Sequence, residues 1–495
     1  MNEKNKKGNE WNSSLAFIMA LIGSAIGIGN IWRYPYVVYS NGGGAFLIPY
    51  ITSILIMALP FYFLEYAVGV KFKTSLPQLY KKIKKPFEYI GWLISFAAFL
   101  ILIYYIVIVG WDLIYFIISF TKGWGVNPEI FFSQTLLHSS NSINGLTQIS
   151  WPILGSLIFI WVLIWGISHQ NLNSGIGKIC KIFIPSLIGI MAIIVFYCLT
   201  LPGASAGVIE LFNPDWNTLL NLNIWLAAAG QILFSIGLGW GVITTYASYL
   251  PEEPNIVKDG TIVTIANCSF ELFTAIGVFS ILGFMSLTEH VPVEKVVTEG
   301  TGLIFIAFPT VFNKTGAFSY IIGPLFFLCV FLAGITTIIS ILEPLSNGIT
   351  SKFKIKRKRI VSILCLIGFI MSLIFTTGMG EYLVKIVDEF INEFGILLVI
   401  ILECIVFGWF YNPNKLLKII NKNKKRKLGN WWVYLINYII PIIFIGLWLN
   451  GIYGIISRKN LTSIIIQTIV LIILLGIPAI LTKLPEKSGK IESVK

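Results

Sequence analysis

The sequence predicts an all-α polytopic membrane protein with twelve transmembrane helices. Hydrophobic residues make up 56% of the 495 residues, charged residues make up 12%, and the mean hydropathy is +0.82. Apolar runs of about 20 residues, the length of a helix that crosses a hydrocarbon core, recur along almost the whole chain. A soluble globular protein is excluded, because the chain has too few polar residues to cover its surface.

Each apolar run predicts one span. The predicted spans cover residues 13–39, 42–70, 87–120, 151–168, 176–201, 224–250, 258–287, 318–350, 359–378, 382–411, 432–456 and 461–482. An even number of spans places both chain ends on one side of the membrane. The Lys-rich N-terminus leads directly into a segment of spanning length, so we expect no cleavable signal peptide.

The distribution of basic residues predicts the orientation. Lys and Arg gather at the N-terminus and in the loops after the second, eighth and tenth spans, at residues 4–7, 71–85, 352–359 and 415–427. Because cytoplasmic loops are enriched in Lys and Arg, we expect a multi-pass protein of the cell membrane with cytoplasmic tails at 1–12 and 483–495. The net charge of +13 then reflects topology and the lipid bilayer, not nucleic-acid binding.

Cysteine and histidine patterns give little support to other kinds of site. The six cysteines fall within or at the ends of predicted spans, so no disulfide framework is implied. The three histidines stand far apart, with no spacing typical of a metal site. A membrane enzyme would need clustered acids or a His–acid pair inside the membrane. The sequence has neither, so we expect no enzymatic activity.

Glycine-rich segments interrupt two predicted spans at mid-membrane. They read GSAIGIGN at residues 23–30 and SIGLGWGV at 235–242. A helix break frees N–H and C=O groups that protein, water, ions or substrate must satisfy. Close helix packing is the alternative explanation for the glycines. Because the breaks lie five spans apart, they predict a 5+5 inverted repeat, with helices 1–5 in 13–205, helices 6–10 in 206–411, and helices 11–12 in 412–482 outside it.

Further motifs make the prediction more specific. The chain carries NIWRYP at 30–35, NGGGAF at 41–46, YASY at 246–249 and AGITT at 333–337. In this order they resemble the neurotransmitter:sodium symporter family. The resemblance implies a leucine-transporter-type fold with broken helices 1 and 6, and symport of Na⁺ with a neutral amino acid by alternating access, with no organic cofactor. A receptor that binds an amino acid without transporting it, or a transporter of an amine or osmolyte, are the alternatives. The sequence does not set the oligomeric state.

The resemblance also implies two sodium sites made of neutral oxygen ligands. The first comprises Ala25, Asn30, Ser235 and Asn267. The second comprises Gly23, Ile26, Ala333, Thr336 and Thr337. The first site would be completed by the carboxylate of the substrate. Ordinary hydrogen bonds between helices, or from threonine to its own backbone, are the alternative roles for these side chains.

The implied substrate site lies at the two breaks. Its expected contacts are Ala25, Ile28, Gly29, Ile101, Tyr105, Phe234, Ser235, Gly237, Trp240, Thr337 and Ile341. N–H groups near Ile28 and Gly29, together with Tyr105, would bind a carboxylate. Trp240 narrows the pocket and Gly237 enlarges it, so we expect a small or medium neutral amino acid.

Intramembrane acids are costly, so each one is a candidate functional residue. Glu271 stands where chloride-dependent relatives have a small polar residue, which implies transport that does not need Cl⁻ and leaves proton counter-movement open. Glu65 and Glu403 resemble family glutamates that cap freed backbone N–H groups at the breaks. The role of the family-like Glu343 stays open.

Gates are implied on both sides of the substrate. Arg33 and Asp388 resemble an outer ion pair that closes with Tyr105 and Phe234, although Glu389 and Glu393 lie near in sequence. On the cytoplasmic side Trp11 is present, but Gly8 and Ser351 stand where the family has an ion pair. Either Lys7 and another acid replace this pair, or the inner gate is weaker. Gly175 and Pro185 predict a segment of the fifth span that unwinds, or a simple packing kink.

Overall fold

The computed structural model describes residues 10–251, 254–290, 300–422, 427–457 and 460–487. These residues form a helical bundle, and within them β-structure is limited to two isolated bridges, Gly43 with Pro214 and Ile149 with Thr377. The predicted all-α fold is confirmed. Gly8 and Lys7, invoked for the inner gate, lie outside the described residues.

Within the described residues, twenty-two α-helices, α2 to α23, follow one another. The first half contains α2 (Ser14–Ala25), α3 (Gly29–Ser40), α4 (Leu47–Ser53), α5 (Leu59–Phe72), α6 (Leu76–Ile83), α7 (Glu88–Ser119), α8 (Pro128–Ile130), α9 (Trp151–Ser168), α10 (Lys178–Leu199) and α11 (Ala204–Phe212). The second half contains α12 (Leu222–Ile236), α13 (Val242–Ser248), α14 (Ile256–Glu289), α15 (Phe308–Lys314), α16 (Ser319–Phe353), α17 (Arg357–Ser372), α18 (Gly380–Phe390), α19 (Leu397–Ile405), α20 (Asn414–Ile420), α21 (Trp431–Tyr434), α22 (Ile440–Ser457) and α23 (Leu461–Lys483).

Short π-helical turns continue several spans between their α-helices. They are η2 (Ile54–Ala58), η6 (Asn173–Gly177), η12 (Ile391–Ile396), η13 (Val406–Phe410) and η14 (Leu435–Ile439). Gly175 lies in η6, where a side chain would come within 2.5 Å of the Ile167 carbonyl oxygen. Unwinding of this segment stays a prediction.

Eleven segments of the described chain are long and apolar enough to cross a membrane. Ten are continuous, and the eleventh is the pair α2 and α3, bent by 54° at the first glycine cluster. The predicted sixth span, 224–250, instead comprises the two short helices α12 and α13 with a break between them. The count of twelve and the inverted repeat therefore stay predictions, while the multi-pass helical fold is established.

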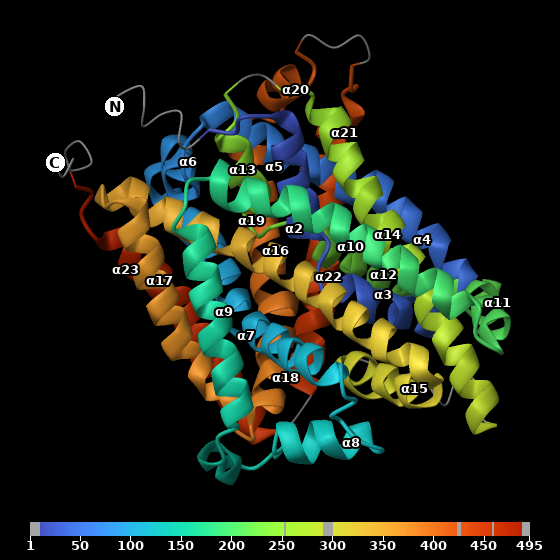
Figure 1. The fold of residues 1–495 in the computed structure, drawn as a ribbon. Coiled ribbons are helices and arrows are strands. Elements are labelled where there is room, and N and C mark those ends of the chain that lie inside the picture. Colours follow the sequence, from blue (N-terminus) through green and yellow to red (C-terminus); the bar gives the residue numbers. More distant parts are fainter. Residues whose placement is uncertain (1–9, 252–253, 291–299, 423–426, 458–459, 488–495) are drawn as a thin grey trace.

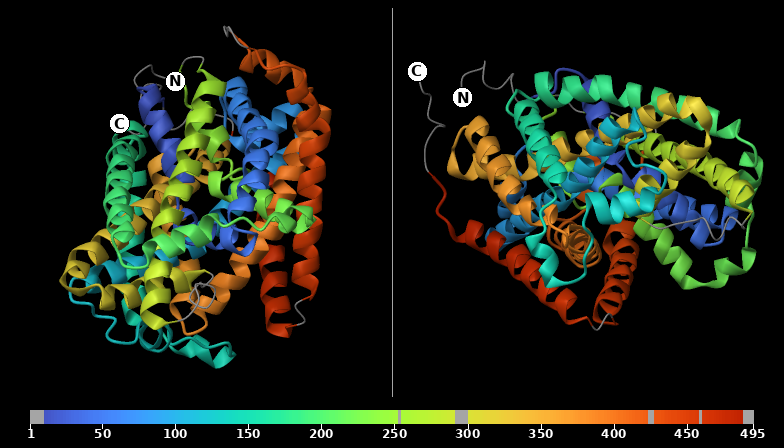
Figure 2. Two further views of the ribbon diagram at one scale, coloured as in Figure 1. Left: turned by 90° about the vertical axis from the view of Figure 1, so that its right-hand side faces the viewer. Right: turned by 60° about the horizontal axis from the view of Figure 1, so that its bottom comes forward.

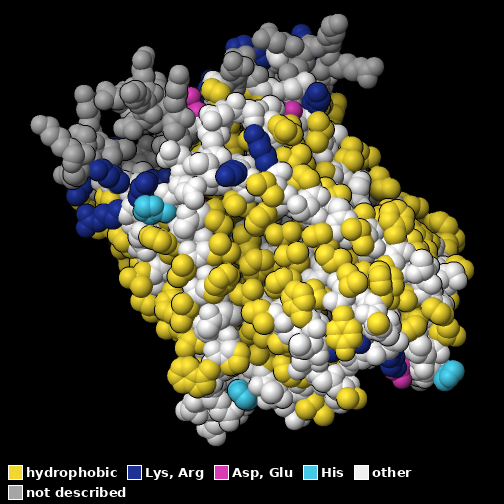
Figure 3. Space-filling view, viewed as in Figure 1, with side chains coloured by type: hydrophobic (Ala, Val, Ile, Leu, Met, Phe, Trp, Pro, Cys, Tyr) yellow, Lys and Arg dark blue, Asp and Glu magenta, His cyan; other side chains and the backbone are white. Residues whose placement is uncertain are grey.

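The connecting segments gather at two ends of the bundle. Helices α6 and α20 lie at one end, whereas α8, α11 and α15 lie at the other (Figure 1). Lys and Arg side chains are concentrated at the first end, and a broad hydrophobic surface covers the middle of the visible face (Figure 3). We call these the basic end and the opposite end. Their separation agrees with the alternation of loops predicted from the sequence.

Helices α7 and α16 form the centre of the bundle. They pack closely because Gly334 has no side chain: a Cβ there would lie 2.6 Å from Val109 Cγ2. Most residues of α7 and α16 are buried, whereas α23 buries only a few. The C-terminal helices α22 and α23 lie at one side of the bundle and diverge from each other, with α23 packed on α7 and α22 packed on α19 (Figure 2).

A buried lysine attaches α23 to the bundle at the basic end. Lys352 Nζ donates to the carbonyl oxygens of Leu481 at 2.6 Å and Thr482 at 3.0 Å, which end α23. The same ammonium group forms an ion pair with Glu88 at 2.6 Å. Cationic groups stabilise helix C-termini because the last carbonyls carry partial negative charge. Close by, Lys81 pairs with Glu486 at 2.7 Å.

Candidate functional site

The first break separates α2 from α3 at residues Ile26, Gly27 and Ile28. Gly27 N donates to Asn30 Oδ1 at 2.8 Å, and Ile28 N donates to the Tyr105 hydroxyl on α7 at 2.9 Å. Side chains therefore satisfy two of the amides that the break frees. Ile28 and Tyr105, both expected to bind a carboxylate, lie in direct contact.

The second break separates α12 from α13 at residues 237–241. Gly237, Gly239 and Gly241 have φ values of +70°, +76° and +71°, which glycine adopts readily and other residues rarely. Gly239 N, one of the amides at this break, donates to Glu65 Oε1 at 3.3 Å. Glu403 instead accepts from the Tyr80 hydroxyl at 2.6 Å.

A buried polar cluster joins three helices beside the breaks. Asn30 Nδ2 on α3 donates to Asn267 Oδ1 on α14 at 2.9 Å and lies 3.4 Å from Ser235 Oγ on α12. Asn267 Nδ2 donates to Ser235 Oγ at 2.5 Å. Ala25, the fourth residue implied for the first sodium site, ends α2. The side-chain oxygens fit a hard cation, because such ions prefer neutral or anionic oxygen ligands.

The residues implied for the second sodium site lie where α2 meets α16. Thr337 Oγ1 lies 3.5 Å from both Gly23 O and Ile26 O, and 3.1 Å from Ala333 O. The first two distances are long for a hydroxyl hydrogen bond, so these oxygens are loosely held. Thr336 Oγ1 bonds back to Leu332 O and Ala333 O on its own helix. The carbonyl and hydroxyl oxygens converge in a way that fits Na⁺.

Aromatic and aliphatic side chains surround the breaks. Ile101 and Ile341 are buried, and Phe234 and Trp240 are partly buried. A side chain at Gly237 would come within 3.3 Å of the Trp240 ring. Trp240 Nε1 is buried without a hydrogen-bond partner among the described residues. Buried polar groups normally have partners, so this donor is available to a ligand.

Glu271 on α14 lies next to the polar cluster. Its carboxylate accepts from Gln231 Nε2 at 2.9 Å and from the Tyr50 hydroxyl, and it also interacts with Ser235. No site role was predicted for Gln231 or Tyr50 from the sequence, because an amide or a phenol in an apolar run does not indicate what it contacts. Together they hold an acidic group within contact of a residue implied for the first sodium site.

The residues expected to form the outer gate lie near one another. The Arg33 guanidinium lies 4.9 Å from the centre of the Phe234 ring, a cation–π contact. Asp388 accepts from Asn392 Nδ2 at 2.8 Å, and its carboxylate senses the charge of Arg33. The structure thus brings Arg33, Phe234 and Asp388 together.

A buried tryptophan, Trp11, contacts the end of α13. Trp11 Nε1 donates to the Tyr246 carbonyl at 2.9 Å, and Trp11 N donates to the Tyr249 carbonyl at 3.1 Å. The indole also packs edge-on against the Tyr246 ring, with centroids 5.3 Å apart. These contacts join the segment before α2 to the end of α13.

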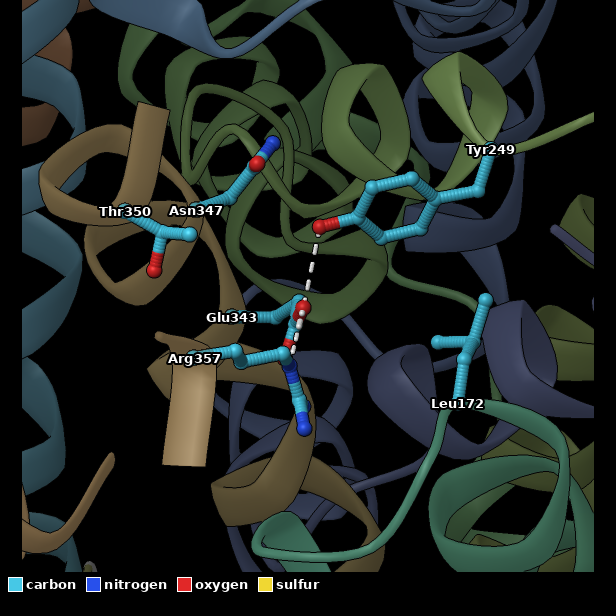
Figure 4. Close-up of a pocket in the computed structure, with 6 residues that line it drawn as sticks. All are labelled: Leu172, Tyr249, Glu343, Asn347, Thr350 and Arg357. Carbon is cyan, nitrogen blue, oxygen red and sulfur yellow. Dashed lines mark hydrogen bonds and ion pairs between the residues drawn. The ribbon is translucent and has the colours of Figure 1, made fainter. Parts of the chain in front are cut away.

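Arg357 and Glu343 form an ion pair that was not predicted from the sequence. It lies beside Tyr249, one of the residues that Trp11 contacts. Arg357 at the start of α17 donates to Glu343 Oε2 at 2.7 Å and to Oε1 at 3.3 Å, and Tyr249 donates to Oε1 at 2.9 Å (Figure 4). Arg357 also donates to the Ser168 and Gln170 carbonyls at the end of α9. Arg357 was missed because it lies in a run of basic residues that topology alone explains.

A cavity of about 40 Å³ adjoins this ion pair and is lined by Leu172, Tyr249, Glu343, Asn347, Thr350 and Arg357 (Figure 4). Ser351 lies on α16, as Glu343 does. Its backbone carbonyl accepts a hydrogen bond from Gln78 Nε2 at 3.2 Å. Glu343, whose role was open, is therefore the centre of a charged cluster at the basic end.

Comparisons with known proteins show which family the chain belongs to. The family model described as "Sodium:neurotransmitter symporter family" matches residues 8–129 and 125–462. An uncharacterized sodium-dependent transporter of Methanocaldococcus jannaschii is 39% identical over 433 residues, covering 88% of each chain. The sodium-dependent serotonin transporter of Drosophila melanogaster is 27% identical, covering 90% of this chain and 76% of its own length.

A vertebrate transporter is also similar. The sodium- and chloride-dependent glycine transporter 2 of Xenopus laevis is 25% identical over 506 residues, covering 89% of this chain and 64% of the relative. The family model spans most of the sequence and includes both breaks and the polar cluster between them. The chain therefore belongs to the sodium:neurotransmitter symporter family and is a multi-pass membrane protein of a family of sodium-coupled transporters.

Proposed function

We propose that this protein imports a small or medium neutral amino acid together with Na⁺, without a requirement for Cl⁻. The observation that carries the proposal is the hydrogen bond from Ile28 N to the Tyr105 hydroxyl, beside the cluster of Asn30, Ser235 and Asn267. An amide and a phenol that contact each other at a helix break can both turn to a bound carboxylate.

Helix polarity supports the same arrangement. The partial positive charge at the N-terminus of α3 favours an anion, and the carbonyl groups at the end of α2 favour a cation. The substrate carboxylate would lie between the α3 amides and the sodium bound by Asn30, Ser235 and Asn267. Each ligand would then raise the affinity of the other by the same factor, which couples them thermodynamically.

Glu271 supports the chloride-independent part of the proposal. Its carboxylate contacts Ser235, and Gln231 and Tyr50 hold it there. A fixed negative charge in this position would balance the bound sodium, which an external anion would otherwise do.

Trp240 and Gly237 support the proposed substrate size. The indole covers Gly237, and its ring lies 3.3 Å from where a side chain would begin. The unpartnered Trp240 N–H gives the pocket one polar group in an otherwise apolar wall. A small or medium aliphatic side chain fits such a wall better than a second large aromatic ring.

The inner gate is proposed to consist of Trp11 and the pair Arg357 and Glu343. A pair with two hydrogen bonds from one guanidinium is geometrically specific. It connects α16 to α17, while Arg357 also holds the end of α9 and Tyr249 joins α13. The basic end is accordingly proposed to face the cytoplasm, with both termini there.

The test is uptake of radiolabelled amino acids into proteoliposomes with an inward Na⁺ gradient. Each amino acid is measured with K⁺ replacing Na⁺ and with gluconate replacing Cl⁻. We expect accumulation that needs Na⁺ but not Cl⁻. Tyr105→Phe is the binding-site variant, and Tyr115→Phe, whose hydroxyl contacts the Phe305 carbonyl elsewhere on α7, is the matched control.

Each other outcome contradicts a named part of the proposal. Saturable binding without accumulation would indicate a receptor. A steep Cl⁻ requirement would exclude the role of Glu271. Sodium-dependent uptake of amines or osmolytes alone would exclude an amino-acid substrate.

A further inference from the structure

Helix α7 carries a buried carboxyl group that takes no part in the sites described above. Asp112 is 0% exposed, and neither of its oxygens has a hydrogen-bond partner among the described residues. It lies inside the span Lys85–Ser119. An ionised carboxylate without compensation costs several kcal/mol at this depth. A neutral carboxyl group, with a proton bound, avoids this cost.

The described neighbours of Asp112 include no positive charge that could take the place of the proton on its carboxyl group. The Cys329 thiol on α16 and the Tyr105 phenol on α7 lie close enough to sense its charge. The thiol itself contacts the Leu187 carbonyl on α10 at 3.5 Å. Within the described part of the chain, no charged side chain from any packed element acts on Asp112. A thiol and a phenol do not form the oxygen cage that a hard cation needs.

Asp112 lies near the proposed second sodium site but outside it. Cys329 precedes Ala333 by four residues, about 6 Å along α16. The backbones of α7 and α16 are close at this level, where Val109 contacts Gly334. Tyr105 lies seven residues from Asp112 and contacts the first break through Ile28. The carboxyl group is thus on the order of 10 Å from the oxygens of Gly23, Ile26 and Thr337.

We propose that Asp112 is a proton-binding site whose protonation is coupled to sodium binding at the site formed by Gly23, Ile26, Ala333 and Thr337. This inference rests on the proposed function, because it needs that sodium site. Bound Na⁺ stabilises the carboxylate, so the O–H bond of the acid breaks and its proton passes to water. By reciprocity, the proton weakens Na⁺ binding. At an effective dielectric constant of about 20, the coupling is on the order of ten-fold in affinity.

The experiment measures binding of ²²Na⁺ to the purified full-length protein in detergent at about pH 5.5 and about pH 8.5. Wild type is compared with Asp112→Asn, with Thr337→Val, and with Asp215→Asn, an exposed aspartate at the opposite end, as the matched control. We expect Na⁺ affinity in wild type and Asp215→Asn to rise on the order of ten-fold with pH. In Asp112→Asn the rise should disappear, while binding persists.

The outcomes separate this inference from the proposed function. Absence of Na⁺ binding in wild type, or full binding in Thr337→Val, would contradict the sodium site itself. An unchanged pH dependence in Asp112→Asn would overturn the role of Asp112 and leave the symporter intact. If Asp112 only fills space in the core, Asp112→Asn should leave the pH dependence of Na⁺ binding unchanged.

A measurement on wild type covers the case in which Asp112→Asn does not fold. The infrared difference spectrum on exchange of K⁺ for Na⁺ should lose the C=O band of one protonated carboxylic acid. Proton release into weakly buffered solution should accompany the exchange. A spectrum without such a band would overturn the proposal.

Discussion

Both helix breaks free backbone amides from their helical hydrogen bonds, but the two breaks compensate for this loss in different ways. At the first break, side chains from other helices satisfy the freed amides, and no residue from Ile26 to Ile28 has a positive φ. At the second break, three glycines take left-handed conformations and the main contact is a single carboxylate, Glu65. The first break can exchange its partners for ligands, whereas the second is held by its own backbone. The difference predicts that the hydrogen bonds of the first break respond to ligands more strongly than those of the second break.

The largest expected effect is at the second break. Gly239 has a φ of +76°, so alanine there would strain the backbone. The added Cβ would also lie 2.4 Å from Ile400 Cγ1 and overpack the site. Each effect should destabilise the folded protein by about 1–3 kcal/mol. We expect little folded protein by size-exclusion chromatography. Gly189→Ala is the control, since its Cβ meets nothing within 4 Å. A well-folded Gly239→Ala protein would show that this break tolerates change.

The next effect is at the first break. Tyr105→Phe removes the hydroxyl that contacts Ile28 N, and we expect amino-acid affinity to fall roughly ten- to hundred-fold. The melting temperature should change little, because the first break can exchange its hydrogen-bond partners for ligands and does not depend on this one hydroxyl. Competition binding of the transported amino acid measures this. Unchanged affinity would remove Tyr105 from the substrate site.

Gly27→Ala tests the space inside the first break. A Cβ there would lie 3.0 Å from the Tyr105 hydroxyl and 3.2 Å from Thr337 Oγ1, without a positive φ. We expect a folded protein with Na⁺ and substrate affinities reduced about ten-fold, because both hydroxyls must shift. Scintillation binding and thermal melting distinguish this from Gly239→Ala. If both glycine variants lose folding alike, the comparison between the breaks fails.

Removal of Na⁺ should distinguish the breaks without any mutation. With K⁺ in place of Na⁺, we expect amide hydrogen exchange to speed up severalfold near Gly27 and Ile28, since their partners include the implied sodium ligands. Exchange at Gly239 should stay nearly constant. Mass spectrometry of peptides covering both breaks reports the two rates in one sample. Equal acceleration at both would mean that Na⁺ stabilises the bundle as a whole.

The smallest effect should come from a surface pair remote from both breaks. This pair is Lys81 and Glu486. Their hydrogen bond lowers the pKa of Glu486 and raises the pKa of Lys81. The Glu486 contribution is present above the usual glutamate pKa and is lost as the pH falls through the lowered value. Because the pair is solvent-exposed, Glu486→Gln should barely alter the pH dependence of melting. A large change would show that the basic end controls overall stability.

Much of the fold could be predicted from the sequence, because hydropathy and glycine clusters report span length and helix breaks directly. The contact of Asn30 with Asn267 connects residues 237 positions apart, and only motif resemblance brought them into one predicted site. Arg357 could not be singled out, since a basic residue at a span end looks the same whether it marks topology or forms an ion pair. Tyr50 could not be found either, because its role depends on how α4 faces α14.

The attachment of α23 through Lys352 has a practical consequence for preparing this protein. A shortened chain that ends before Leu481 would leave a buried ammonium group without two of its acceptors, although α23 looks dispensable at the edge of the bundle. An affinity tag at this end should therefore follow the whole of α23. Deletion libraries that trim from that end should show an abrupt loss of yield near Leu481.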